Sequence, residues 1–201
     1  MIEAVLSDMV RMSSSNSITE EHRSLLLSLA KKSIQNGLLT GKPLPINVTD
    51  YPAELQQKRA TFVTLQINGQ LRGCIGTLEA ERPLVLDVVK NAFAAAFNDP
   101  RFPALRDFEF DRLEYHISVL TPAEPMSFSS EQDLLSQIRP GIDGLIIQEG
   151  HHRGTFLPSV WESLPDRNDF LVHLKNKAGL PPFYWSDTLK VFRYTTESFP
   201  E

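Results

Sequence analysis

Two strand-like segments joined by the dipeptide Asn68-Gly69 constrain the fold more than any other feature of this sequence. The first, residues 61–67, is rich in β-branched residues, and the second covers residues 70–77. Asn and Gly both tolerate a positive φ, which the tight two-residue turns of β-hairpins require. The pattern therefore predicts an antiparallel hairpin, and with it a largely antiparallel sheet.

The rest of the chain alternates helical and strand patterns. A capping hydroxyl at Thr19 and apolar residues at helical spacing predict a first helix that ends at Gly37. Pro83 introduces a second, alanine-rich helix that ends at Asn98. Further strands are expected at 113–120, 144–148, 151–157 and 188–196, and further helices at 131–138, after Pro158 and at 167–178. Short hairpins with helices on one side predict the α+β class.

The two halves of the chain, about 19–105 and 108–199, share a short pattern. Residues 68–73 (NGQLRG) and 149–154 (EGHHRG) each carry a turn and then a Gly-x-x-Arg-Gly strand, and a helix introduced by proline follows. Their offset is 81 residues, the difference between Gly150 and Gly69. The pattern predicts one domain, residues 1–201, with an internal duplication of a strand-rich unit in a shared sheet. A chance match is the alternative.

Composition excludes several classes of protein. The net charge is -5 and no basic run is present, so no nucleic-acid binding is expected. Cys74 is the single cysteine and cannot form an internal disulfide, and the first residues lack the apolar core of a signal peptide. No uncharged apolar stretch reaches the ~18 residues of a membrane span. We therefore expect a cytoplasmic protein that has no contact with a membrane.

The second strand of the predicted hairpin carries the chemistry. Residues two apart on a strand share a face, so Arg72, Cys74 and Gly76 are expected to point the same way. A guanidinium beside a thiol increases the fraction present as thiolate, and Gly73 and Gly76 allow a ligand to approach the backbone. The pattern fits a cysteine nucleophile or an anion pocket. It equally fits a buried thiol that acts as a small hydrophobe, with the glycines at a bend of the sheet.

Histidines offer a base rather than a metal site. Beside Cys74, His116 would act as a general base, and otherwise it is a hydrogen-bonded strand residue. His151 and His152 are adjacent, and neighbouring strand residues face opposite ways, so the pair cannot easily hold one ion. No metal and no cofactor are expected.

Arginines supply the expected anion site. Arg153 is the counterpart of Arg72 in the second half, and the two would converge on one cleft with Arg101 at its rim. Alternatively, both strand arginines face solvent. If a carboxylate of the chain pairs with these arginines, the cleft is a structural salt-bridge network. The candidate carboxylates are Glu79, Glu114 and Asp99. Without such pairing, an anion such as phosphate, sulfate or a carboxylate would occupy the site.

Residues 71–77 (LRGCIGT) resemble the central motif of the AMMECR domain family, which includes protein A of the AmmeMemoRadiSam system. Further matching segments follow in the family's order, at residues 62–65, 99–103, 117–122, 154–158 and 177–181. The resemblance covers about residues 19–199. It implies a compact α+β fold with a barrel-like sheet built from two related halves, and a cleft at the strand that carries Cys74.

The family resemblance implies partners but no reaction. Bacterial and archaeal relatives are associated with a Memo-type protein and a radical-SAM protein, which are therefore the partners to expect. Lys175 stands where relatives often have cysteine, and His116 stands where they often have an acidic residue. A mechanism that needs a second thiol or that carboxylate is therefore not expected.

These observations favour an enzyme or enzyme partner that binds a small or protein-borne anionic group. The residues expected to react are Cys74 and His116, and those expected to bind the ligand are Arg72, Gly73, Gly76, Thr77, Arg101 and Arg153. The alternative is a non-catalytic interaction module that docks a partner through an exposed edge or through the region of Trp161 and Trp185.

Overall fold

The computed structural model describes residues 18–201, which form two compact units. The first unit comprises the residues up to Val119 together with Glu197–Glu201, and the second comprises Leu120–Thr196. Each unit has its own four-stranded sheet and its own apolar core. Among the described residues, no helix has the length and apolar character needed to cross a membrane.

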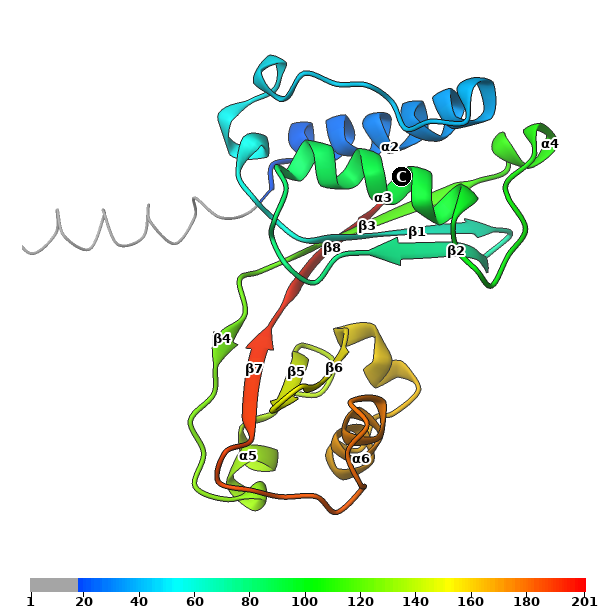
Figure 1. Ribbon diagram of the computed structural model, residues 1–201. Coiled ribbons are helices and arrows are strands. Elements are labelled where there is room, and N and C mark those ends of the chain that lie inside the picture. Colours follow the sequence, from blue (N-terminus) through cyan, green and yellow to red (C-terminus); the bar gives the residue numbers. More distant parts are fainter. Residues whose placement is uncertain (1–17) are drawn as a thin grey trace, which may run out of the picture. The chain divides into compact units, whose positions relative to one another are not determined.

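In the first unit the strand order is β2-β1-β3-β8. The strands are β1 (Thr61–Ile67), β2 (Gln70–Gly76), β3 (Glu114–Leu120) and β8 (Thr196–Pro200), and the longer helices are α2 (Glu20–Thr40) and α3 (Leu84–Phe97). Helix α3 packs on the sheet and α2 packs on α3, both on the same side (Figure 1). Val63, Leu65 and Ile117 are fully buried in the core of this unit. The alternate side chains of these strands therefore lie on the face opposite α3.

Short elements connect the main ones in the first unit. They are η1 (Val48–Asp50), η2 (Ala53–Gln56) and α4 (Asp107–Phe110). The segment between α3 and α4 runs along the edge strand β2, because residues of this segment hydrogen-bond to β2. This segment therefore positions side chains beside the residues of β2.

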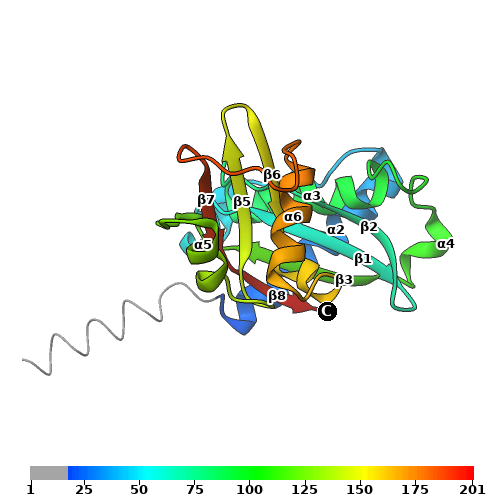
Figure 2. The same ribbon diagram turned by 90° about the horizontal axis from the view of Figure 1, so that it is seen from below.

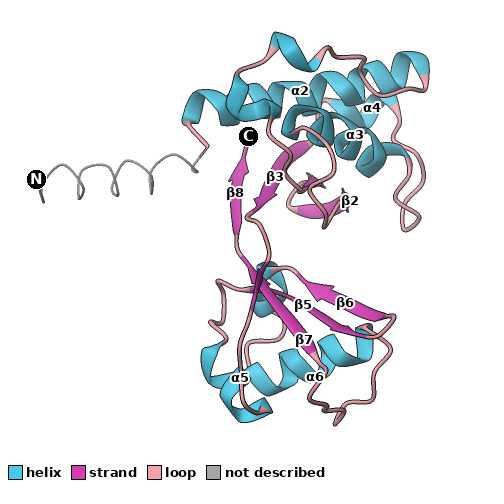
Figure 3. Cartoon of the chain, turned by 60° about the vertical axis from the view of Figure 1, so that its left-hand side comes forward, coloured by secondary structure: helices cyan, strands magenta, loops and turns pink. Residues whose placement is uncertain are grey.

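In the second unit the strand order is β4-β7-β5-β6. Its elements are β4 (Glu124–Pro125), α5 (Glu131–Gln137), β5 (Gly144–Glu149), β6 (His152–Phe156), η3 (Pro158–Glu162), α6 (Arg167–Lys177) and β7 (Lys190–Tyr194). Helices α5 and α6 lie on the same side of this sheet (Figure 3), and α6 crosses the β5–β6 hairpin (Figure 2). Leu134, Ile147, Phe170 and Val191 from these elements share one core.

The predicted hairpin is confirmed, with one irregularity. Asn68 and Gly69 have φ values of 53° and 72°, as a tight hairpin turn requires. The β1–β2 register shifts between Leu65 and Gln66, because Leu65 lies opposite Gly73 whereas Gln66 lies opposite Leu71. Arg72 is thus the extra residue of a β-bulge.

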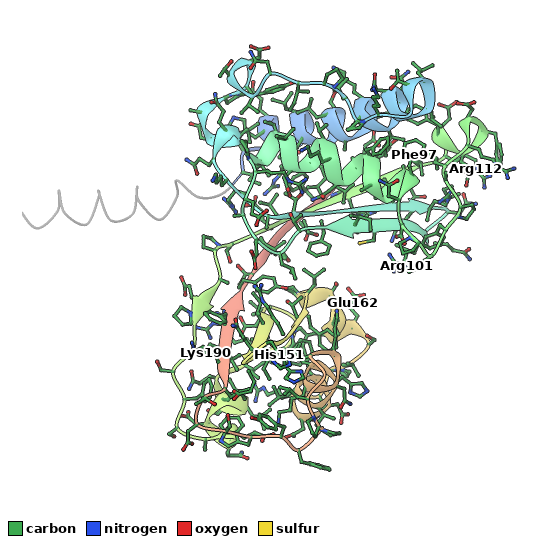
Figure 4. The ribbon with its side chains drawn as sticks, in the orientation of Figure 1. Phe97, Arg101, Arg112, His151, Glu162 and Lys190 are labelled. Carbon is green, nitrogen blue, oxygen red and sulfur yellow. The ribbon has the colours of Figure 1, made fainter. Side chains whose placement is uncertain are left out.

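Two expected element boundaries are wrong. The first helix passes through Gly37 and ends at Gly41, which has a φ of 70°. A Cβ at Gly37 would lie 2.3 Å from the ring of Phe97, at the end of α3 (Figure 4), so close packing explains this glycine. The predicted strand at 188–196 is divided between β7 and β8, which belong to different sheets.

The single barrel-like sheet expected from the sequence is replaced by two separate sheets. The chain halves also differ from the two units, because β3 and β8 come from the second half and complete the sheet of the first unit. Each unit does contain a hairpin followed by a helix, and β2 and β6 are both edge strands beside their hairpin partners. A duplication of these units stays a prediction.

Candidate functional site

Two side chains hydrogen-bond to the free backbone groups of the edge strand β2. The backbone N–H of Cys74 donates to Oδ2 of Asp99 at 2.8 Å, and Nη2 of Arg101 donates to the carbonyl of Cys74 at 3.1 Å. Asp99 and Arg101 also form an ion pair of 2.7 Å with one another. They supply Cys74 with the hydrogen bonds that a further strand would make, so they fix both the strand and the position of Arg101 at its edge (Figure 4).

This ion pair leaves part of the guanidinium available. The Asp99 side chain is 1% exposed, whereas that of Arg101 is 54% exposed. The Arg101 guanidinium holds the pKa of the Asp99 carboxyl well below its usual range, despite the opposing effect of burial. The hydrogen bonds that Arg101 donates to Asp99 raise the pKa of Arg101, and interaction with Cys74 adds to this rise. Nε and Nη2 of Arg101 make hydrogen bonds, whereas Nη1 makes none with residues 18–201.

Cys74, Thr64 and His116 form a row across three strands. Thr64 lies directly opposite Cys74 on one side and His116 on the other. Directly opposite residues of an antiparallel sheet point to the same face, so the row lies on the face opposite α3. The hydroxyl of Thr64 donates to Sγ of Cys74 at 3.2 Å. The imidazole of His116 is half-buried and has no hydrogen-bond partner in the described part of the chain.

The neighbouring row adds an aromatic ring and a pair of hydroxyls. Phe62 lies opposite Gly76 and Ser118, and a Cβ at Gly76 would lie 2.3 Å from the Phe62 ring. The hydroxyls of Ser118 and Ser198 are 2.8 Å apart. We call this surface the Cys74 face, defined by Phe62, Thr64, Cys74, His116 and Ser118. It combines a thiol, hydroxyl groups, an imidazole and an apolar ring.

Arg72 is committed to a carboxylate that the sequence analysis did not select. Its guanidinium binds Glu109 through Nε at 2.7 Å and Nη2 at 3.1 Å, and it also donates to the carbonyl of Pro103. The expected partners Glu79, Glu114 and Asp99 do not contribute this contact, because α4 brings Glu109 to the bulge. The bond from Arg72 lowers the pKa of Glu109, and a backbone N–H of Arg106 acts in the same direction. The guanidinium that contacts Cys74 is that of Arg101.

Gly73, Gly76 and Thr77 each have a structural partner. A Cβ at Gly73 would lie 2.0 Å from the carbonyl oxygen of Ala95 in α3, so the glycine allows the helix to approach the sheet. Gly76 makes room for the ring of Phe62. Thr77 donates to Asp87 at 2.9 Å. These contacts explain the three residue types without a ligand.

Comparison with known proteins places the chain in a family. The AMMECR1 family matches residues 27–199. The chain belongs to the AMMECR1 family. A protein of Methanothermobacter thermautotrophicus is 40% identical over 183 residues, which cover 88% of this chain and 92% of the relative. Protein MJ0810 of Methanocaldococcus jannaschii is 36% identical over 192 residues, with 92% of each chain covered.

A solved structure supports the fold of this AMMECR1-family chain. The crystal structure of the uncharacterized protein PH0010 from Pyrococcus horikoshii matches with a TM-score of 0.82 and 38% sequence identity. The match covers 92% of this chain and 93% of that one. The family and the α+β class are thus shown.

The second unit holds the remaining residues singled out in the sequence. Arg153 is exposed on β6, and its convergence with Arg72 on a common cleft stays a prediction. His151 (Figure 4) lies in the turn before β6, and its ring is 4.4 Å from that of His152, so the two rings do not face opposite ways. Lys175 is fully buried, with Nζ 3.1 Å from Glu131, which makes it a paired core residue.

Sequence reasoning missed Thr64, Glu109 and the role of Asp99 in holding both the backbone of Cys74 and the side chain of Arg101. The signal for Thr64 was the hairpin register, but a regular two-residue hairpin would have placed Gly73 opposite Thr64. The bulge at Arg72 moves Cys74 into that position. Sequence separation hides the other two, because Glu109 and Asp99 reach β2 only through the path of the segment after α3.

The close approach of α3 makes Gly73→Ala destabilising. The added methyl would meet the backbone of Ala95, which cannot move without shifting the helix. We expect a loss of about 1–3 kcal/mol in the free energy of unfolding, as for other overpacked positions. Urea denaturation followed by circular dichroism measures it. Cys74→Ala on the same strand is the control, and equal losses in the two variants would contradict the steric explanation.

The two ion pairs predict a loss of stability in acid. Folding lowers the pKa of Asp99 and of Glu109. Their stabilisation is therefore complete above the unfolded carboxyl values of about 4, and it is lost as the pH falls through the lower folded values. We expect the free energy of unfolding to fall from about pH 5 downwards, with a smaller slope in Asp99→Asn. Urea denaturation at stepped pH tests this, and an unchanged slope would show that the pair contributes nothing.

Proposed function

We propose that this AMMECR1-family protein is an enzyme, or the partner of one, that binds an anionic group on the Cys74 face of its first unit. The anionic group is carried by a small molecule or by a modified protein. The observation that carries the proposal is the position of Arg101, which contacts Cys74 and keeps Nη1 uncommitted. Cys74 is the group that reacts, and a Memo-type and a radical-SAM protein are the proposed partners.

The contacts of Arg101 with Asp99 and with the carbonyl of Cys74 make its guanidinium suitable for binding an anion. A guanidinium held by Asp99 and by the carbonyl of Cys74 loses little conformational freedom when a ligand binds. Its fork is occupied by Asp99, so the remaining Nη1 edge suits one anionic oxygen rather than a bidentate contact. Arg72 is paired with Glu109, and for this reason we propose Arg101 rather than Arg72 as the residue that binds the anion.

Anion binding is tested by thermal stability. An anion that binds only the folded protein stabilises it by about 1.4 kcal/mol at ten times its dissociation constant. We expect phosphate, sulfate or acetate to raise the melting temperature of the wild type by a few degrees more than that of Arg101→Gln, which lacks the recognising group. Arg112→Gln removes the same charge from an exposed site (Figure 4) and is the control. Equal shifts in wild type and Arg101→Gln would remove the proposal.

A non-catalytic interaction module is the second candidate, and Phe183 favours it. This side chain is 90% exposed at the tip of a turn closed by the hydrogen bond from Tyr184 N–H to the Pro181 carbonyl at 3.0 Å. Trp161, by contrast, is buried, and Trp185 packs against Phe128 at 5.6 Å. Because the two tryptophans are covered and Phe183 is not, we propose that the docking surface in this region is centred on Phe183. Weaker binding of a Memo-type protein by Phe183→Ser, measured by calorimetry, would support this second function.

A further inference from the structure

Two functional groups without a hydrogen-bond partner in residues 18–201 lie near the thiol of Cys74, one on the Cys74 face and one at the edge of β2. The imidazole of His116 and Nη1 of Arg101 are uncommitted within the described residues, whereas the hydroxyl of Thr64 already contacts the thiol of Cys74. Thr64 stands between the other two members of its row, directly opposite each. Its hydroxyl can both donate and accept a proton.

We infer that Thr64 conducts the proton of the Cys74 thiol to His116, and that the resulting thiolate attacks an electrophilic carbon whose anionic substituent binds Arg101. The inference rests on the proposed function and adds to it a proton path and a class of substrate. That class comprises activated acyl or alkyl groups that carry a nearby carboxylate or phosphate.

The geometry explains why Thr64 is needed. Cys74 and His116 lie on β2 and β3, with β1 between them. Directly opposite residues have Cβ atoms about 4.5–5.5 Å apart, so His116 cannot reach the sulfur two strands away without an intermediate. Thr64 Oγ1 is 3.2 Å from Sγ, and His116 is the residue directly opposite Thr64, so the relay requires its imidazole to turn a ring nitrogen towards the same oxygen. A relay through one hydroxyl closes the gap.

The reaction balances without a further reactant. The thiol proton passes to Oγ1 of Thr64 while the hydroxyl proton of Thr64 passes to a ring nitrogen of His116. The Thr64 hydroxyl then donates to the thiolate, which is the orientation of the observed contact. The sulfur electron pair forms the new S–C bond, and the bond from that carbon to its leaving group breaks. The leaving group departs with the bonding pair and accepts the proton held by His116.

Several charged side chains lie near the row formed by Cys74, Thr64 and His116. Arg101 and Asp99 approach Cys74 from the segment after α3, and Arg72 with Glu109 lies at the bulge of β2. Glu114 is exposed on β3, two residues from His116 and therefore on the same face. From β8 the side chain that meets this face is Ser198, which is neutral. A pH profile of the thiol therefore has to be compared with variants that leave these charges in place.

The test measures the alkylation rate of Cys74 in the full-length protein. Cys74 is the only cysteine, so the mass of the intact chain reports its reaction directly. Iodoacetamide is a neutral probe and iodoacetate is its anionic counterpart. Each rate, from about pH 5 to about pH 9, is divided by the rate of the urea-unfolded protein. The variants are Thr64→Val, Thr64→Ser, His116→Gln and Arg101→Gln, and a circular dichroism spectrum confirms that each is folded.

We expect Thr64→Val and His116→Gln to slow alkylation by iodoacetamide near neutral pH about tenfold, below the roughly 100-fold at which the usual range of enzymatic proton-transfer catalysis begins, and to change its pH profile in the same way. Thr64→Ser keeps the hydroxyl and should retain the wild-type rate and profile. The double variant should be no slower than either single one, because the two residues act as one unit. Rates and profiles of Thr64→Val equal to those of Thr64→Ser would overturn the relay.

The paired reagents test the class of substrate. Arg101→Gln should lower the ratio of the iodoacetate rate to the iodoacetamide rate about three- to fivefold, the range of a partly exposed ion pair. An unchanged ratio would overturn the anionic class. If anions raise the melting temperature as proposed but Thr64→Val and Thr64→Ser are alkylated at equal rates, the relay fails and the binding function stands. If the two Thr64 variants differ in alkylation rate but no anion raises the melting temperature, the binding function fails instead.

Discussion

Asp87→Ala is expected to destabilise the first unit by about 3–5 kcal/mol, the cost of breaking a buried charged network. The carboxylate is 1% exposed and lies in α3. It accepts hydrogen bonds from the backbone and hydroxyl of Thr61, from Asn91 and from Thr77, and it binds Arg82 at 2.7 Å. These contacts fasten the start of α3 to β1 and to the end of β2. Alanine would leave several buried donors and one guanidinium without an acceptor.

Urea denaturation and hydrogen exchange measure this effect. Exchange protection should fall in the first unit and persist in residues 120–196, since the network lies wholly within the first unit. Glu54→Ala, at an exposed carboxylate of the same unit, should change stability by less than about 0.5 kcal/mol. If Asp87→Ala does not fold, Thr77→Ala removes one donor and should cost about 0.5–1.5 kcal/mol. A stable Asp87→Ala protein with wild-type protection would contradict the role of the network.

Trp161→Ala is expected to cost the second unit about 3–5 kcal/mol, as for other large aromatic side chains removed from a core. The Trp161 ring is stacked on Phe170 at a centroid distance of 3.7 Å, with 4° between the planes. Its Nε1 donates to the carbonyl of Asp143 at 2.8 Å. Alanine would therefore leave a cavity between η3 and α6, and an unpaired carbonyl on β5's N-terminal side.

Two matched variants separate these contributions. Trp161→Phe keeps an aromatic ring on Phe170 but loses the hydrogen bond, and we expect a smaller loss of about 1–3 kcal/mol. Phe183→Ala removes an aromatic ring that is 90% exposed and should leave stability within about 0.5 kcal/mol of the wild type. Hydrogen exchange should show the loss of protection in residues 120–196. Equal unfolding free energies for Trp161→Ala and Phe183→Ala would contradict a core role for Trp161.

The sequence by itself determined the local elements of this protein. Asn68 and Gly69 predicted the first hairpin because few residues accept a positive φ, and Thr19 and Pro83 marked the starts of two helices through their local geometry. Residues 71–77 pointed to the family and to the strand that carries Cys74. These signals are short-range, so they can be read from neighbouring residues alone.

Only the tertiary structure decided which side chains meet at the candidate site. The β-bulge at Arg72 shifts the register by one residue, and this shift places Cys74 opposite Thr64 instead of Val63. Because strand faces alternate with a period of two, one extra residue moves Cys74 from the α3 side to the opposite face. The partners of Arg72 and Cys74 lie 37 and 25 residues away along the chain, and their approach depends on the packing of α3 and the path of the segment after it.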